Sequence, residues 1–341
     1  MFENFFPKYV TAKNIVFFIM AVLFIIFITK IQDIAIMFFA SYVIACSLNP
    51  IVSKLEKKFK RSTAAAIVLG SSILILLAFF VPVIILSGHE IRNFSTSLPK
   101  YFIALYNNII QMPVISKLGL SQFDWQGILS SASAYTSNIF NEIINLGLNL
   151  GSAFIYLIVS LIIIYYFMAD IELIKNTYLK LFPKNLREKA GDISNIISKK
   201  IGGYIIALIA TVASVGVIMV IGLLACRVDY AVLLGLLTAV LDIVPIVGPA
   251  IALLICLIAT FESGWGAVVA VLVVFAIAQI VENNFVRPYV FSKFLDIHPI
   301  MIYLFLFISA KYIGPVGIIL APAIAATFCV LVEELYMKNL E

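Results

Sequence analysis

The chain has 341 residues, of which 63% are hydrophobic and 12% are charged, and its mean hydropathy is +1.12. A soluble domain carries about 25% charged residues, and several apolar runs here exceed the ~18 residues that mark a membrane-spanning helix. The composition excludes a soluble globular protein and indicates an integral membrane protein. The net charge of +5 lies in discrete loops, so it indicates orientation in the membrane and not binding to nucleic acid.

All four cysteines, Cys46, Cys226, Cys256 and Cys329, lie inside or at the ends of apolar runs. Their spacing matches no metal-binding pattern, and buried thiols behave as small hydrophobic side chains. We therefore expect no metal site and no cofactor.

Residues 1–87 predict three membrane spans, at 15–29, 34–48 and 64–86. No small-residue cleavage site follows the first apolar run, which indicates a membrane helix and not a signal peptide. The loop before the third span is the densest basic stretch of the chain, with Lys54, Lys57, Lys58, Lys60 and Arg61. The positive-inside rule places this loop in the cytoplasm.

Residues 88–145 mix polar and aromatic side chains and contain few basic residues. This pattern predicts amphipathic helices at the outer, extracytoplasmic membrane surface. Residues 146–201 begin with a fourth span, at 146–168, and continue with a basic segment. We expect that segment to be amphipathic, cytoplasmic and in contact with anionic lipid headgroups.

The stretch 230–261 is apolar except at its centre, which contains Asp242, Pro245, Gly248 and Pro249. As one helix its 32 residues would reach about 48 Å, whereas the hydrocarbon core is about 30 Å thick. Because proline interrupts a helix, the stretch must break there. In lipid, broken backbone is tolerated only where protein or water covers it. The prolines and Gly248 would also free backbone groups that could bind a substrate.

Two paths across the membrane remain open for this stretch. In a re-entrant hairpin both of its ends lie outside, and a span at 265–281 then delivers Arg287 and Lys293 to the cytoplasm. In a single bent span, these two basic residues face outward. The positive-inside rule favours the hairpin.

Residues 300–335 repeat the pattern, with apolar arms interrupted at Gly314, Pro315 and Gly317, and with Pro322 further along. The 36 residues are again too long for one span. We predict a second hairpin that enters from the opposite side, because paired opposed breaks mark the substrate site of many transporters.

The predicted fold is therefore an all-α polytopic membrane protein. It has six full spans, two opposed re-entrant helical hairpins and amphipathic interfacial helices, with eight hydrophobic segments in all. The transport core would be residues 202–341, which hold spans at 202–226 and 265–281 and hairpins at 230–261 and 300–335.

Asp242 is the strongest functional candidate, because a carboxylate inside a membrane is costly unless it has a partner or a role. It would coordinate a cation or exchange a proton, or it would cap the broken turn or pair with a basic residue. Lys311 would neutralise it if the two hairpin tips meet. The long side chain of Lys311 would also reach the membrane interface.

Further polar side chains lie at the end of the 265–281 span. Gln279, Glu282 and Asn283 share one helical face, and Asn284 follows them. They would line the substrate or ion path, or form a solvated helix end.

Two other polar residues in this region have plainer interpretations. Arg287 with Pro288 predicts a helix end and a membrane anchor. His298 before Pro299 predicts a turn residue.

Four motifs carry a family resemblance: LDIVPIVGP (241–249), QIVENNFVRP (279–288), LDIHP (295–299) and GPVGIILAPAIA (314–325). With them the chain resembles the autoinducer-2 exporter family, also called PurR-regulated permeases. The resemblance implies export of a small signalling molecule or cation/proton antiport, a homo-oligomer such as a pentamer, and a bacterial cytoplasmic membrane. The chain departs from the family at 308–312, where ISAKY replaces a glycine-rich approach, so the substrate is not carried over.

These observations predict a secondary transporter that exports a small polar solute or signalling molecule, coupled to an ion or proton gradient through hairpin movement. The alternatives are a monovalent cation/proton antiporter and a passive channel. No Walker phosphate loop, HExxH or GxSxG occurs, so we expect neither ATP hydrolysis nor an intramembrane enzyme. The expected partners are a small-molecule or ion substrate, the lipid bilayer and further copies of the chain.

Overall fold

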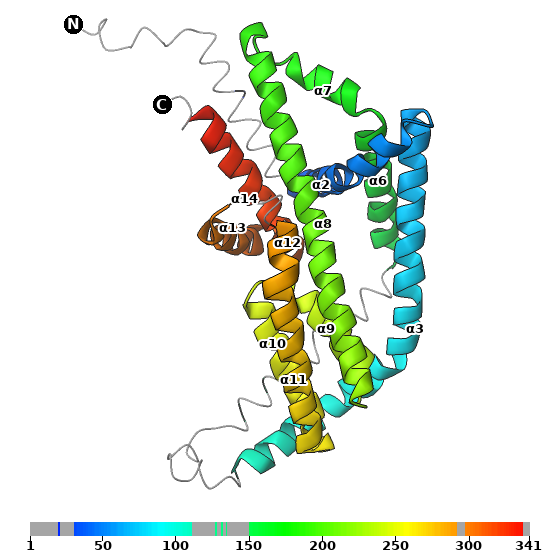
Figure 1. Cartoon of the computed structure of the whole chain (residues 1–341), viewed down its shortest axis with the longest axis vertical. Coiled ribbons are helices and arrows are strands. Elements are labelled where there is room, and N and C mark those ends of the chain that lie inside the picture. Colours follow the sequence, from blue (N-terminus) through cyan, green and yellow to red (C-terminus); the bar gives the residue numbers. More distant parts are fainter. Residues whose placement is uncertain are drawn as a thin grey trace, which may run out of the picture.

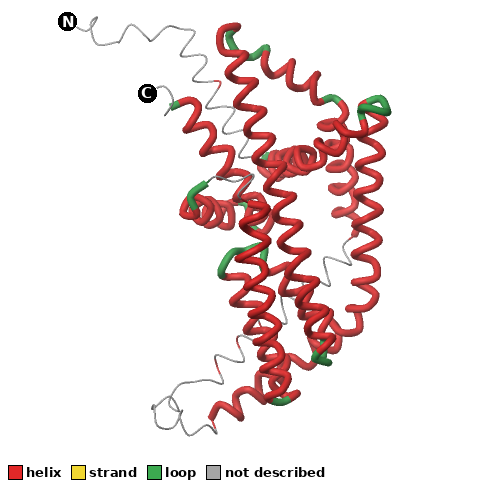
Figure 2. The backbone as a smooth tube through the Cα atoms, viewed as in Figure 1, coloured by secondary structure: helices red, strands yellow, loops and turns green. Residues whose placement is uncertain are grey.

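The protein is helical throughout the part of the chain that its computed structural model describes, residues 20, 31–110, 127, 131, 134, 150–291 and 297–336. No strand occurs within these ranges, and short turns join the helices (Figure 2). The all-α prediction is confirmed. The predicted first span at 15–29 and nearly all of 111–145 lie outside the described residues.

Five helical stretches among the described residues are long and apolar enough to cross a membrane: Gln32–Leu55, Arg61–Ala78, Lys184–Ala225, Trp265–Val290 and Pro315–Leu335. A sixth candidate combines Phe154–Ala169 with Ile171–Leu179, which meet at a bend of 78°. The protein is thus a membrane protein, and its described residues contain five or six candidate spans by length and composition.

Three helices pack together at the N-terminal side of the described chain: α2 (Gln32–Leu55), α3 (Arg61–Ile110) and α6 (Leu150–Ala169). Arg61 joins them, because its guanidinium donates to the Met168 carbonyl oxygen at 2.9 Å and to Asn49 Oδ1 at 2.7 Å. The basic loop is therefore fixed to the end of α6.

Helix α3 runs on through Ile110, well beyond the end of the predicted third span at residue 86. The sequence places only Ser87 and Gly88 at that point. One glycine costs a helix about 1 kcal/mol, which is too little to end it.

Helix α8 (Arg187–Ala225) is the longest described helix after α3 and follows α7 (Ile171–Leu179) and the 3-10 turn η2 (Lys184–Leu186). Its 39 residues correspond to about 58 Å along the long axis of the molecule (Figure 1). It packs against α2, α9, α11 and α14. A Cβ atom on its Gly202 would lie 2.5 Å from the Cys46 carbonyl oxygen, so α2 and α8 cross at backbone contact.

The stretch 230–261 folds as two helices, α9 (Ala231–Leu241) and α10 (Val247–Thr260), that pack against each other. Thr238 Oγ1 of α9 lies 3.7 Å from Cys256 Sγ of α10. The predicted break is confirmed, and we call this pair the first hairpin. Pro249 lies in the first turn of α10, where a missing N–H leaves no helical hydrogen bond unmade.

Helix α11 (Trp265–Val281) follows the 3-10 turn η3 (Phe261–Ser263) and ends where the sequence predicted its span to end. The chain nevertheless stays helical through a π turn, η4 (Glu282–Val286), and a last α-helical turn, α12 (Arg287–Phe291). This helix lies beside α8 over much of its length (Figure 1).

Residues 300–335 also form two packed helices, α13 (Pro299–Tyr312) and α14 (Pro315–Leu335), which we call the second hairpin. The rings of Phe305 and Phe328 are 5.3 Å apart across it. The break at Gly314 and Pro315 is where the sequence predicted it. The arms are unequal, since α14 alone is long enough to span a membrane.

Candidate functional site

The first hairpin places a carboxylate at its turn. Asp242 caps the C-terminal end of α9 and is only 3% exposed. Neither oxygen of this carboxylate has a hydrogen-bond partner among the described residues. Burying such a group without a partner costs several kcal/mol, so its position calls for a ligand or a proton.

A strained turn follows Asp242. The Val247 N–H donates to the Pro245 carbonyl oxygen at 2.8 Å, and Ile246 between them has φ 69° and ψ −57°. This is the rare γ-turn geometry, and for a β-branched residue it is an outlier. Strain of this kind costs about 1–3 kcal/mol and persists only where the surroundings enforce it.

A backbone contact at Gly248 enforces this strained geometry. A Cβ atom at this position would lie 1.7 Å from the Leu241 carbonyl oxygen, so the backbones of α9 and α10 touch here. Only glycine fits. The turn therefore closes tightly onto the end of α9, where Asp242 is buried.

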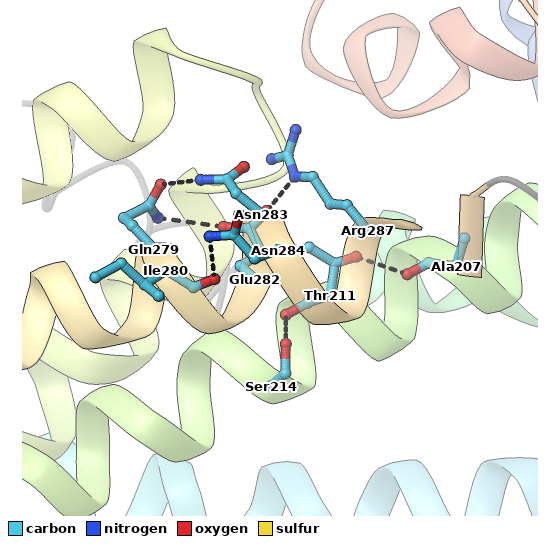
Figure 3. A network of polar contacts seen from close by, with 9 residues as sticks. All are labelled: Ala207, Thr211, Ser214, Gln279, Ile280, Glu282, Asn283, Asn284 and Arg287. Carbon is cyan, nitrogen blue, oxygen red and sulfur yellow. Dashed lines mark hydrogen bonds and ion pairs between the residues drawn. The ribbon is translucent and has the colours of Figure 1, made fainter. Parts of the chain in front are cut away.

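A second buried carboxylate belongs to Glu282, which is 0% exposed. Its Oε2 accepts a hydrogen bond from Gln279 Nε2 at 3.2 Å, and its Oε1 accepts one from Arg287 Nε in an ion pair. Asn283 Nδ2 lies 3.4 Å from Gln279 Oε1 and extends the chain of polar contacts (Figure 3). Unlike Asp242, Glu282 is fully partnered.

The π turn makes the Glu282–Arg287 pair possible. Residues five apart point to different sides of an α-helix, whereas in a π turn each residue bonds to the fifth one along. The Arg287 N–H indeed donates to the Glu282 carbonyl oxygen. Asn284 Nδ2 donates to the Ile280 carbonyl oxygen at 2.9 Å and supports the widened backbone.

The predicted helix end at Arg287 and Pro288 is wrong. In a regular helix the ring of Pro288 would clash with the carbonyl group of residue 284. A π turn, in which the helix backbone is wider, precedes Pro288, and the helix continues to Phe291. Arg287 is the ion-pair partner of a fully buried acid, and 34% of its side chain is exposed. Its role as a membrane anchor stays a prediction.

Asp242 and Glu282 come from different elements but form one site. The charges of Glu282 and Arg287 act on the Asp242 carboxyl group, and the Gln279 and Glu282 side chains lie near it without the geometry of a hydrogen bond. The turn of the first hairpin and the π turn of α11 therefore meet at two carboxylates and one guanidinium. If all three groups are ionised, this cluster carries one net negative charge.

Helix α8 packs against η4 and forms one side of this site (Figure 3). Thr211, which is 4% exposed, and Ser214 lie there, and both hydroxyl groups donate to backbone carbonyls of their own helix. Neither residue could be selected from the sequence, because isolated Thr and Ser residues are common in apolar helices.

The second hairpin lies apart from this cluster. Lys311 is exposed, with its Nζ 5.3 Å from the centre of the Tyr312 ring, and it takes part in neither ion pair found among the described residues. The predicted Lys311–Asp242 pair is absent, and the cation beside Asp242 is Arg287.

The other candidates of the second hairpin have structural positions. Gly314 (φ 78°) and Pro315 form its turn. Gly317 and Pro322 are buried in α14, and a Cβ atom on Gly317 would lie 2.5 Å from the Ser309 carbonyl oxygen. Gly317 therefore allows α13 and α14 to pack closely. Within the described ranges, no three His, Cys, Asp or Glu side chains gather as a metal site.

Comparison with known proteins gives one family. The family model described as "AI-2E family transporter" matches residues 15–337. The chain is 26% identical to "Putative transport protein YueF" of Bacillus subtilis over 297 residues, which cover 82% of this chain and 78% of that protein.

Two other relatives differ in coverage. The chain is 30% identical to "Putative transport protein YrrI" of Bacillus subtilis over 178 residues, 52% of this chain and about half (50%) of that protein's length. It is 20% identical to a "Sodium-lithium/proton antiporter" of Halobacillus andaensis, over 94% of this chain and 95% of that protein.

Proposed function

This chain belongs to the AI-2E family of transporters, and we propose that it is a secondary transporter that exchanges a proton for a monovalent cation at Asp242. As a member of this family it is a membrane transport protein and not an enzyme. The observation that carries the proposal is the Asp242 carboxylate, which is buried without a hydrogen-bond partner among the described residues and lies next to a carboxylate that has two.

The charge of the site selects the ligand. Arg287 neutralises Glu282, which leaves one negative charge on Asp242. A single proton or a single monovalent cation brings the cluster to neutrality, whereas a divalent cation would leave an excess positive charge in a medium where charge is costly. Exchange of one cation for one proton then moves no net charge.

The hairpin supplies the movement. The strained turn at Ile246 joins two short helices, and Asp242 lies immediately before it. A change of conformation at this turn would carry Asp242 away from Glu282 and Arg287 and expose it to the other side of the membrane. The re-entrant path of the first hairpin belongs to this proposal, since it lets water reach Asp242 alternately from two sides.

The relative named as a sodium-lithium/proton antiporter supports this choice of ions, since its match covers nearly the whole length of both chains. Export of a small polar solute is the second candidate, and the family's description favours it. In that case the proton at Asp242 would drive the solute. We place the protein in the bacterial cytoplasmic membrane, as a homo-oligomer.

Proteoliposomes with a trapped pH-sensitive dye test the proposal. Addition of Na⁺ or Li⁺ outside should drive protons out of vesicles that contain the wild-type protein, with saturation, and vesicles with Asp242→Asn should show none. The rate should not change when valinomycin and K⁺ set the membrane potential. Proton flux without any dependence on Na⁺ or Li⁺ would favour solute export, and unsaturable flux would indicate a channel.

A further inference from the structure

A groove at the basic end of the molecule has no part in the proposed transport site. It has a volume of about 320 Å³ and lies between α2, α7, α8 and α14. Its walls are almost entirely apolar or aromatic and include Phe182, Leu186, Ile193 and Leu331, with Lys189 as the charged residue in the lining.

The segment beside the groove has the form of an interfacial elbow. Helix α7 turns 78° away from α6 and returns through η2 into α8, which it contacts. At the elbow Leu181 is 84% exposed, and Phe182 and Leu186 are also exposed. Apolar side chains at such a tip are typical of a segment that lies in the membrane interface.

Cations surround these apolar residues. Lys180 and Lys184 are exposed and belong to neither ion pair found among the described residues. Arg187 uses its guanidinium to donate to the Lys180 and Phe182 carbonyl oxygens, so its charge is not cancelled by a carboxylate there. Residues 180–189 carry four basic side chains and one acidic one, Glu188, so positive charge is in excess on this side of the groove.

We infer that this groove binds one anionic glycerophospholipid, with an acyl chain between α2, α8 and α14 and the phosphate group near Lys184 and Lys189. The apolar lining fits an acyl chain, and the cations complement the headgroup, each lysine near the surface adding to the attraction of an anionic lipid. A zwitterionic lipid would fill the same groove without this charge complementarity.

Bromine-labelled lipids test the inference in the full-length protein. A reporter carries Phe182→Trp in the groove, with Trp125→Phe and Trp265→Phe to remove other signals, and is reconstituted with acyl-brominated phosphatidylglycerol or phosphatidylcholine. We expect the brominated phosphatidylglycerol to quench Trp fluorescence with at least about threefold higher apparent affinity. In the double variant Lys184→Gln/Lys189→Gln, the ratio of the two apparent affinities should fall to one.

A matched control places the same two changes elsewhere. Lys57 and Lys58 are exposed in the α2–α3 loop, and Lys57→Gln/Lys58→Gln should keep the preference. Ala190→Leu, which fills the groove, should reduce quenching by both lipids while the oligomer still elutes normally in size exclusion. Equal quenching by the two lipids in the reporter protein would overturn the inference. Weak quenching by both lipids would also overturn the inference, since it would mean that a second protein surface covers the groove.

Discussion

The two hairpins are built from similar parts but differ in what they bury. Each has a short apolar helix, a turn with a residue at positive φ, and a second helix with proline in its first turn. In the first hairpin the acid at the turn, Asp242, is 3% exposed. In the second, the charged residue before the turn, Lys311, faces outward.

The turns differ in strain as well. Gly314 adopts φ 78° and ψ −153°, a region that is essentially restricted to glycine, and it does so without crowding. Ile246 adopts its positive φ although it is β-branched, and the backbone contact at Gly248 holds it there. The second turn is therefore a relaxed connection, whereas the first is held in place around a buried charge. This difference is the reason why we propose that transport depends on the first hairpin.

The largest effect that separates the hairpins should come from their charged residues. Asp242→Asn should reduce cation-driven proton flux to background, because the amide cannot bind a proton or carry the charge that attracts a cation. Lys311→Met should keep most of the flux, because Lys311 is exposed and lies outside the carboxylate cluster. Dye-based flux measurements at equal protein amounts decide this, and loss of flux in Lys311→Met would restore the second hairpin to the mechanism.

The ion pair at the π turn should give the largest effect on stability. Arg287→Gln leaves Glu282 buried with an uncompensated charge, which costs about 3–5 kcal/mol and should lower the melting temperature by about 10 °C. The double variant Glu282→Gln/Arg287→Gln removes both charges and should recover most of this loss. Thermal unfolding of the wild type, the single variants Glu282→Gln and Arg287→Gln, and the double variant measures the coupling. Additive losses in the double variant would argue against the pair.

Backbone contact in the first hairpin should give a somewhat smaller effect. Gly248→Ala forces the hairpin apart, since the new Cβ would lie 1.7 Å from the Leu241 carbonyl oxygen. We expect a loss of about 3 kcal/mol, the upper end of overpacking costs, and a lower melting temperature.

Gly266 in the first turn of α11 provides the matched control for this change. A Cβ atom at Gly266 would have nothing within 4 Å. Gly266→Ala should therefore leave stability unchanged or raise it by up to about 1 kcal/mol. Equal melting temperatures for the two variants would mean that α9 and α10 do not touch.

The sequence alone was enough to predict both breaks and the buried acid, because proline and glycine in an apolar run leave a helix few options. It was not enough to predict the partner of that acid. The Asp242–Lys311 hypothesis rested on the two hairpin tips meeting, and such long-range contacts depend on packing that periodicity does not encode. The role of Arg287 was missed because residues five apart share a face only in a π turn.

The same limits apply to the ends of elements. The 265–281 span was predicted to its last residue, but the helix beyond it was not, since Pro288 alone predicts a stop. The local signal for the longer helix is ENNFVRP (282–288), which holds an acid, two asparagines and an Arg-Pro pair. A proline inside a helix is tolerated where a widened turn precedes it.

The smallest effect should come from the start of the second hairpin. His298 caps α13, with its Nδ1 accepting from the Ile300 N–H at 3.3 Å, and it is exposed. His298→Ala removes one cap and should cost about 0.5–1 kcal/mol, while His298→Asn should keep the cap. Because α13 takes no part in the carboxylate cluster, both variants should transport at the wild-type rate, and their unfolding curves should differ by a few degrees at most. A change in the pH dependence of transport in His298→Ala would give the second hairpin a role in proton movement that its exposed, uncrowded turn does not suggest.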